Sequence, residues 1–170
     1  MNRDIYIQNL QNNASEILEV LDQCSSELLS KKVGEAWSIL EILEHIFLTE
    51  RLVYVMLLRP SSKQAEKEEV IGQEKLQKLI VNLRARKLKA PDSLEPKGKI
   101  KSKEEFIKLF SEQRASLMLD VEGAKIQISL ASYVHPFLGE MTIRDWLHFI
   151  PLHSKRHLEQ IKDIMKKKEA

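Results

Sequence analysis

The chain has 170 residues, of which 43% are hydrophobic and 31% charged, and its formal net charge is +2. This length can bury one substantial core without disulfides, so we expect a single domain over residues 1–170. The small net charge argues against a nucleic-acid partner, although residues 84–103 are locally basic. The sequence contains neither an apolar run long enough for a membrane helix nor a signal-peptide pattern, so we expect a cytoplasmic protein without a membrane partner.

Helix-forming residues dominate the composition and predict an all-α fold. Apolar side chains recur at helical spacing over residues 3–29, which we expect to form the first helix. Cys24 lies within this pattern and has no second cysteine to pair with, so we expect a packed, inert thiol. Ser38 and Glu41 have the spacing of a capping box, which predicts a second helix from Ser38 to about Leu58.

The middle of the chain carries weaker patterns. Residues 66–88 are expected to form a connecting helix, followed by a loop that completes a crossover. Ser102 followed by glutamates predicts the start of a third long helix, and Gly123 predicts its end. The sequence shows no internal repeat or interdomain linker.

The segment before the last helix is expected to be extended or looped. Alternating side chains at 126–130 favour a short strand, and a turn is expected at 136–139. Thr142 is expected to cap the last helix, which continues to about residue 168. Pro151 lies inside this helix, where it removes a backbone donor, so we expect a kink or a restart there.

Histidines occupy positions in the helical patterns where apolar side chains are expected. His153 and His157 lie four residues apart, so both rings project from one helical face. They continue the apolar stripe of the last helix, which includes Trp146, Ile150 and Ile161. His148 falls on the opposite side and is expected to be a solvated histidine, not a ligand.

His45 occupies a similar position in the second helix. It falls on the stripe Ile42, His45, Thr49, Leu52 and Met56. Taken singly, each inward histidine fits a neutral core residue with a hydrogen-bond partner. Burying three imidazoles without partners would cost about 1 to 3 kcal/mol each, so the set favours a shared metal ion. Three protein ligands leave coordination positions open, as in catalytic metal sites.

Other candidate groups near the histidines do not stand out by their spacing. Each of the acidic candidates is interpreted as a surface carboxylate or a partner that orients a histidine, so the catalytic residues stay unknown. These candidates are Glu44, Glu50, Asp145 and Glu159. Arg156 has two interpretations, a clamp for an anionic substrate group or a surface salt bridge.

Three stretches carry a resemblance to a known family. They are Trp37-Ser38 with Glu44-His45, then His135-Pro136-Phe137-Leu138-Gly139-Glu140-Met141-Thr142, then Trp146-Leu147 with His153-Ser154-Lys155-Arg156-His157-Leu158-Glu159-Gln160-Ile161. Together they resemble the DinB/YfiT-like superfamily over nearly the whole chain, with a looser match at 59–101. The resemblance implies a four-helix bundle with a long crossover and an extra short helix, often a homodimer. It also implies a divalent metal held by His45, His153 and His157, the same residues that the stripes indicate.

The activity implied by the resemblance is less specific than the metal site. Members resemble metal-dependent hydrolases acting on small-molecule substrates, which is our first interpretation. The alternatives are a thiol S-transferase that uses a low-molecular-weight thiol such as bacillithiol, and a metal-binding bundle without catalysis. Nickel, zinc, iron and manganese all accept imidazole, so the sequence leaves the identity of the metal open.

Overall fold

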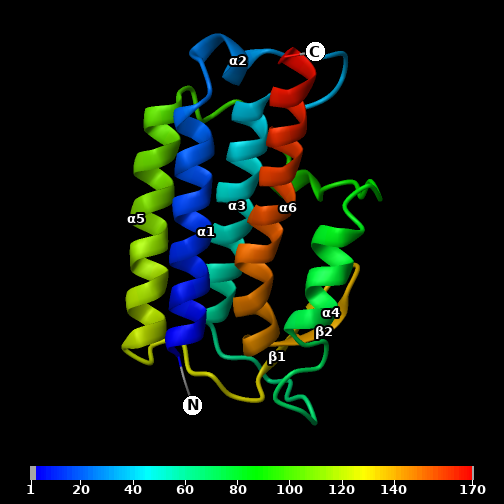
Figure 1. Cartoon of the computed structure of the whole chain (residues 1–170). Helices are drawn as coiled ribbons and strands as arrows, with labels where there is room; N and C mark the ends of the chain where they lie inside the picture. Colours follow the sequence, from blue (N-terminus) through cyan, green and yellow to red (C-terminus); the bar gives the residue numbers. More distant parts are fainter. Residues whose placement is uncertain (1–2, 170) are drawn as a thin grey trace.

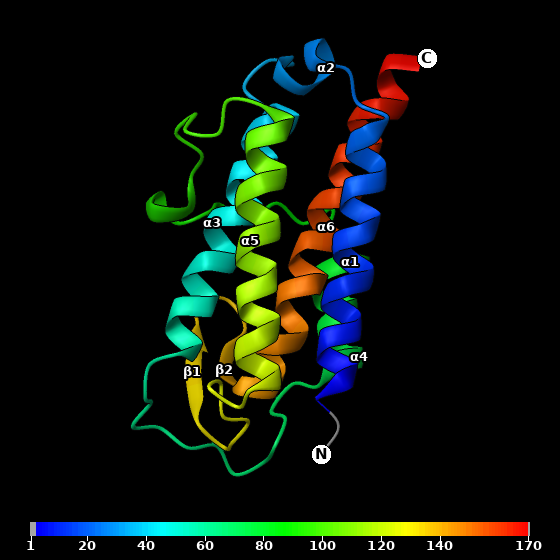
Figure 2. The ribbon, with the colours of Figure 1, turned by 90° about the vertical axis from the view of Figure 1, so that its left-hand side faces the viewer.

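Four long helices lie side by side in the computed structural model, which describes residues 3–169 (Figures 1 and 2). They are α1 (Asp4–Asp22), α3 (Ile39–Leu57), α5 (Lys103–Glu122) and α6 (Ile143–Glu169). Helices α1 and α3 each pack against both α5 and α6. The predicted all-α four-helix bundle is confirmed, with a two-stranded sheet added to it. Residues 1, 2 and 170 of the expected domain lie outside the described part of the chain. Within the described part, no helix is long and apolar enough to span a membrane.

The first helix is shorter than predicted. Helix α1 ends at Asp22, and a separate short helix, α2 (Ser26–Ser30), follows. Ser25 has an extended backbone, and its hydroxyl accepts a hydrogen bond from the amide of Leu28, which starts the new helix. Cys24, in the break, is 4% exposed, and burial raises the pKa of its thiol, as expected for a packed thiol.

The helix starts predicted from caps are confirmed. The hydroxyl of Ser38 accepts from the amide of Glu41 at 3.2 Å, and the Glu41 carboxylate accepts from the amide of Ser38 at 2.8 Å. Both halves of the capping box are therefore present at the start of α3. Ser102 caps α5 by accepting from the amide of Glu105, and α5 ends before Gly123.

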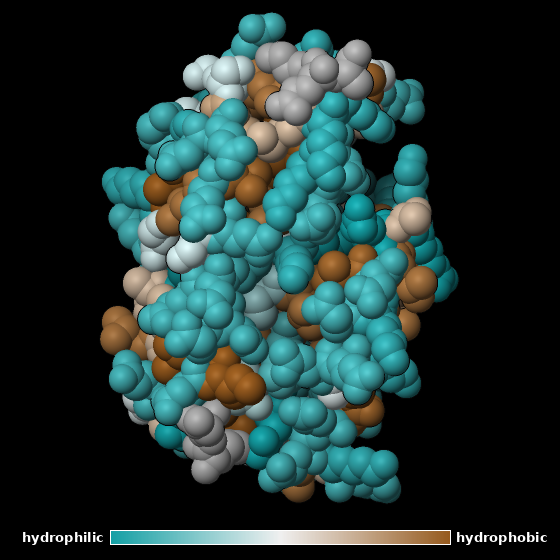
Figure 3. Space-filling view, in the orientation of Figure 1, coloured by the Kyte–Doolittle hydropathy of each residue, from teal (hydrophilic) through white to brown (hydrophobic). Residues whose placement is uncertain are grey.

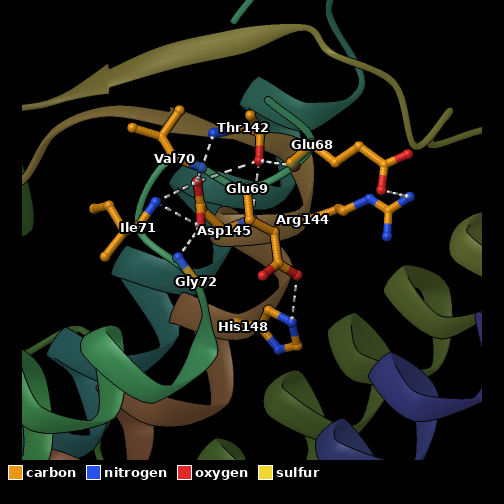
Figure 4. Close-up of polar contacts among 9 residues, drawn as sticks. All are labelled: Glu68, Glu69, Val70, Ile71, Gly72, Thr142, Arg144, Asp145 and His148. Carbon is orange, nitrogen blue, oxygen red and sulfur yellow. Dashed lines mark hydrogen bonds and ion pairs between the residues drawn. The ribbon is translucent and has the colours of Figure 1, made fainter. Parts of the chain in front are cut away.

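The crossover between α3 and α5 holds less helix than the 66–88 predicted from sequence. It contains α4 (Gln73–Gln77), a π-helical turn η1 (Lys78–Asn82) and a 3-10 turn η2 (Asp92–Leu94). The segment before α4 is not helical because the buried carboxylate of Asp145 holds its amides: Val70 donates at 2.9 Å and Gly72 at 2.8 Å (Figure 4). A buried carboxylate needs hydrogen-bond donors to replace the water that it loses, and these backbone amides are the donors for Asp145.

The extended segment also differs from the prediction. The strands are β1 (Ser132–His135) and β2 (Gly139–Thr142), paired antiparallel, and not residues 126–130. Residues 126–130 alternate in polarity although they form no strand. Ile126 is buried in the core, and its amide donates to a carbonyl of α5 and not to a neighbouring strand. The predicted turn at 136–139 is confirmed as the hairpin turn.

Helix α6 begins and continues largely as expected. The hydroxyl of Thr142 accepts from the amide of Asp145 at 3.3 Å, which confirms the predicted cap. The helix runs through Pro151 without a restart, so that part of the prediction is wrong. The C-terminal end of α6 extends past the neighbouring ends of α1, α3 and α5 (Figure 1).

A layer of buried polar side chains divides the hydrophobic core into two clusters. Its centre is Arg114 on α5, which is 2% exposed. This buried arginine was not predicted from the sequence, because only the apolar residues of α5 were considered. Its guanidinium donates to the carboxylate of Glu50 on α3 at 2.7 Å and to the amide oxygen of Asn13 on α1 at 2.9 Å. It also donates to the hydroxyl of Ser154 on α6 at 3.4 Å. One side chain thus links all four long helices.

Removing one partner of this buried ion pair should destabilise the bundle strongly. Arg114→Met leaves the Glu50 carboxylate buried without its cation, so the free energy of unfolding in urea should fall by about 3 to 5 kcal/mol. The double variant Arg114→Met, Glu50→Leu should recover most of that loss. Lys78→Met, which removes an exposed ion pair with Glu74, is the control and should cost less than about 1 kcal/mol. A double variant no more stable than the single one would contradict this account.

Candidate metal centre

The structure brings His45 of α3 together with His153 and His157 of α6. One ligand atom from each residue can be chosen so that all three lie within 4.8 Å of one another. The ring centroids are 4.6 Å to 5.2 Å apart. Nitrogen ligands about 2.0 to 2.1 Å from one tetrahedral ion lie roughly 3.4 Å apart, so small side-chain shifts would close this cluster around an ion.

Hydrogen bonds orient two of the three rings. The Nδ1 atom of His45 lies 2.8 Å from the carbonyl oxygen of Leu94. A carbonyl only accepts, so Nδ1 carries the proton and Nε2 keeps its lone pair. His157 has the same arrangement, with its Nδ1 3.0 Å from the amide oxygen of Gln160. This is the tautomer that metal-binding histidines use when they coordinate through Nε2.

The local electrostatics keep the three rings neutral. Burial lowers the pKa of His45, and burial together with the nearby His45 ring lowers the pKa of His157 to about 3. Burial and the two neighbouring rings also hold the pKa of His153 well below its usual value. Neutral imidazole is the form that binds metals, so the cluster needs no deprotonation near neutral pH.

Aromatic side chains surround the cluster. The ring of Trp37 lies 5.0 Å from that of His45, and Phe149 stacks on His153 at 5.3 Å with 26° between the planes. His45 and His157 are buried, whereas His153 is half-buried. The cluster is therefore most open beside His153.

His148 is not the solvated residue predicted from the helical wheel. It is 5% exposed, its Nε2 lies 3.4 Å from the Glu69 carboxylate, and its ring packs 4.9 Å from that of Tyr6 (Figure 4). The crossover covers this face of α6, which a pattern within one helix does not reveal. His148 is not part of the three-histidine cluster, and its expected lack of a ligand role stays a prediction.

The stripe predicted around His45 is partly wrong. Leu52 is 53% exposed, whereas Glu50 and Val53 are buried, so the inward face of α3 turns away from Leu52 after Thr49. His45 itself is 5% exposed, as the prediction requires.

Within residues 3–169, none of the acidic candidates makes a hydrogen bond to a histidine of the cluster, and three of the candidates are buried. Glu44 is 1% exposed and accepts from the amides of Lys97 and Lys99, each at 2.9 Å. It therefore holds the crossover segment that carries Leu94, the partner of His45. Glu50 pairs with Arg114, Asp145 holds residues 70–72, and half-buried Glu159 pairs with Lys162.

Within residues 3–169, Arg156 makes no salt bridge and binds backbone carbonyls instead, whereas its role as a clamp for an anionic substrate group stays a prediction. Its guanidinium donates to the carbonyl oxygen of Ile80 at 3.0 Å and to that of Arg86 at 2.7 Å. These contacts attach the crossover to α6. The sequence could not have indicated these two hydrogen bonds, because both acceptors are backbone carbonyls of a segment far from Arg156 in the chain.

Comparison with known sequences identifies the class of protein. A sequence model described as the DinB superfamily matches residues 9–161, so the chain belongs to this superfamily. Among individual proteins, it is 32% identical over 146 residues to "Uncharacterized protein YuaE" of Bacillus subtilis (strain 168), covering 85% of this chain and 88% of YuaE.

Two solved structures share the fold. TT2238, described as a four-helix bundle protein, is 22% identical with a TM-score of 0.62, over 95% of this chain and 99% of its own. YfiT from Bacillus subtilis is 14% identical with a TM-score of 0.66, over 98% of this chain and 87% of its own. YfiT is described as "a probable metal-dependent hydrolase with an unusual four-helix bundle topology".

Acid should destabilise the metal-free protein through the histidine cluster. Unfolded histidines have a pKa near 6.5, and the folded protein holds that of His157 at about 3. Below about pH 6.5 the unfolded chain binds protons that the folded state excludes, so stability is present above that pH and is lost as the pH falls. In His157→Leu the slope of unfolding free energy against pH, measured in urea between about pH 6 and 4, should be smaller by up to about 1.4 kcal/mol per pH unit. Equal slopes in the two proteins would count against a neutral buried ring.

Proposed function

We propose that His45, His153 and His157 bind one divalent metal ion and that the chain is a metal-dependent hydrolase of small molecules. The observation that carries the proposal is the convergence of three neutral rings, two of which have Nδ1 engaged and Nε2 free. Membership of the DinB superfamily and the description of YfiT support it.

The residues around the cluster suit hydrolysis of an ester or amide. Three imidazole ligands leave coordination positions for water and substrate. A divalent ion supplies Lewis acidity, which can bring the pKa of a coordinated water near 7. Trp37 and Phe149 provide apolar walls that limit water around the rings. Glu44 keeps the His45 ring in place through the crossover segment.

The finer features stay predictions. The metal is nickel, zinc, iron or manganese, since each accepts imidazole. A low-molecular-weight thiol as co-substrate would make the protein an S-transferase that uses the same ligands. A cytoplasmic location and a homodimer are the further expectations, and light scattering of the purified protein measures the second.

The metal site itself is tested by elemental analysis. Protein purified without chelator should contain about one equivalent of a transition metal, and His45→Ala and His157→Ala should each lose it. His135→Asn, which changes a histidine outside the cluster, should keep the metal. Metal-free wild-type protein that cannot be reloaded would make the three histidines ordinary core residues.

The reaction type is tested with chromogenic esters and amides. The reloaded protein should hydrolyse at least one of these probes without added thiol, and chelation or His157→Ala should reduce the rate to that of metal-free protein. Turnover that requires bacillithiol and an electrophile would replace hydrolysis with thiol transfer. A fully loaded protein with neither activity would support a non-catalytic metal site.

A further inference from the structure

Thr49 on α3 carries a buried hydroxyl that the proposed function does not use. The residue is 6% exposed, and its Oγ1 atom is closed to solvent and has no hydrogen-bond partner within residues 3–169. A threonine inside a helix often bonds to a carbonyl of the preceding turn, and Thr49 does not make that bond. Buried hydroxyls are normally paired, so the partner of this one remains to be identified.

Thr49 lies one helical turn beyond His45 on the same face of α3. Side chains four residues apart in a helix are neighbours, with Cβ atoms about 5 to 6 Å apart. Both residues are buried, and the His45 ring contacts the rings of His153 and His157 on α6. Thr49 therefore faces the interface between α3 and α6 that holds the three histidines.

The polar layer shows which residue of α6 lies opposite Thr49. Arg114 donates to Glu50 on α3 and to Ser154 on α6, so these two residues lie at a similar height along the bundle. Thr49 and His153 directly precede them in the chain. The two helices run in opposite directions (Figure 1), and one residue is about 1.5 Å of rise. Thr49 and His153 are therefore level with each other to within about one helical turn.

His153 is the member of the cluster whose ring makes no hydrogen bond within residues 3–169. The ring of His45 has the carbonyl oxygen of Leu94 as its partner. The ring of His157 has the amide oxygen of Gln160. A histidine that binds a metal through one nitrogen almost always donates its other N–H to an oxygen, which fixes the orientation of the ring. The third ring therefore needs an acceptor.

Thr49 is the acceptor that fits this N–H. Among the described residues, the other buried side-chain atoms without a partner are nitrogens and the Oε2 atom of Glu50. Glu50 faces Arg114 in the polar layer. The unpartnered nitrogen of His148 belongs to a ring that packs against Tyr6 of α1, not against α3. A hydroxyl oxygen accepts hydrogen bonds as readily as the carbonyl and amide oxygens that serve the other two rings.

We propose that the Thr49 hydroxyl accepts a hydrogen bond from the ring N–H of His153 when that ring binds a metal ion. This inference rests on the proposed metal site. Thr49 is then a positioning residue, which acts through His153 by fixing the ring orientation and the nitrogen that is left for the ion. The bond forms with the same small shift of the rings that closes the cluster around the ion. The hydrogen of the Thr49 hydroxyl stays available for a carbonyl of the preceding turn.

Metal affinity tests the proposal with two variants of Thr49. Thr49→Val removes the hydroxyl and keeps the shape of the side chain, whereas Thr49→Ser keeps the hydroxyl. In competition with a chromogenic chelator, Thr49→Val should bind Zn²⁺ about tenfold more weakly than wild type, the effect of losing the partner of a metal-binding histidine. Thr49→Ser should restore most of the affinity. Ser116→Ala, which removes an exposed hydroxyl from α5, is the control and should bind Zn²⁺ as wild type does.

The stability of the metal-free protein separates positioning from an ordinary structural role. In the metal-free protein the hydroxyl is buried without a partner, so its removal in Thr49→Val should leave the midpoint of urea unfolding unchanged or raise it. A hydroxyl that stabilises the fold would instead give a lower midpoint.

Nuclear magnetic resonance of the Zn²⁺-loaded protein tests the hydrogen bond itself. A ring N–H that is hydrogen-bonded within the protein exchanges slowly with water and gives an observable signal. Wild type and Thr49→Ser should each show such a signal for His45, His153 and His157. Thr49→Val should lose the signal of His153 and keep the other two.

The outcomes distinguish this role from the metal site. Wild-type Zn²⁺ affinity in Thr49→Val, a lower unfolding midpoint of its metal-free form, or a persistent His153 N–H signal would each overturn the role of Thr49 and leave the metal site standing. Failure of Thr49→Ser to restore affinity would do the same. If the wild-type protein binds no Zn²⁺, the proposed metal site fails and this inference fails with it.

Discussion

The need to satisfy one buried cation organises this bundle. Arg114 cannot stay in the core unless acceptors surround it, and they come from α1, α3 and α6. Glu50 and Ser154, two of these acceptors, lie on the helices that carry the candidate ligands. The layer therefore restricts how far α3 and α6 can slide past each other. That alignment decides whether His45 meets His153 and His157.

The crossover is the second determinant of the site. Buried carboxylates hold its backbone at two points, Glu44 at residues 97 and 99 and Asp145 at residues 70–72 (Figure 4). Between these points, Arg156 binds two of its carbonyls. The surface on this side is mixed, with apolar side chains among polar ones (Figure 3). The irregular crossover thus has a fixed position against the helices, because charged side chains of the helices make hydrogen bonds with its backbone amides and carbonyls.

Sequence patterns predicted the features whose causes are local. The capping box at Ser38 and the His-x-x-x-His pair depend on residues three or four apart, and helical geometry alone brings those together. The patterns failed where the partner is distant. They did not indicate a buried Arg114 and they predicted a solvated His148, because the groups that contact these two side chains come from other elements. The helix expected at 66–88 was shortened for the same reason, since Asp145 competes for its amides.

The hydrogen bond between His45 and Leu94 has a thermodynamic consequence. It joins the candidate ligand to a residue 49 positions further along the chain, within the least regular part of the structure. Ordering of residues 92–99 and occupation of the site are then linked equilibria, each favouring the other by the same free energy. Cleavage of the backbone in that segment would weaken the site without touching any of the three rings. The crossover thus influences ligand binding at the site in the way that a separate effector molecule would, although it is part of the same chain.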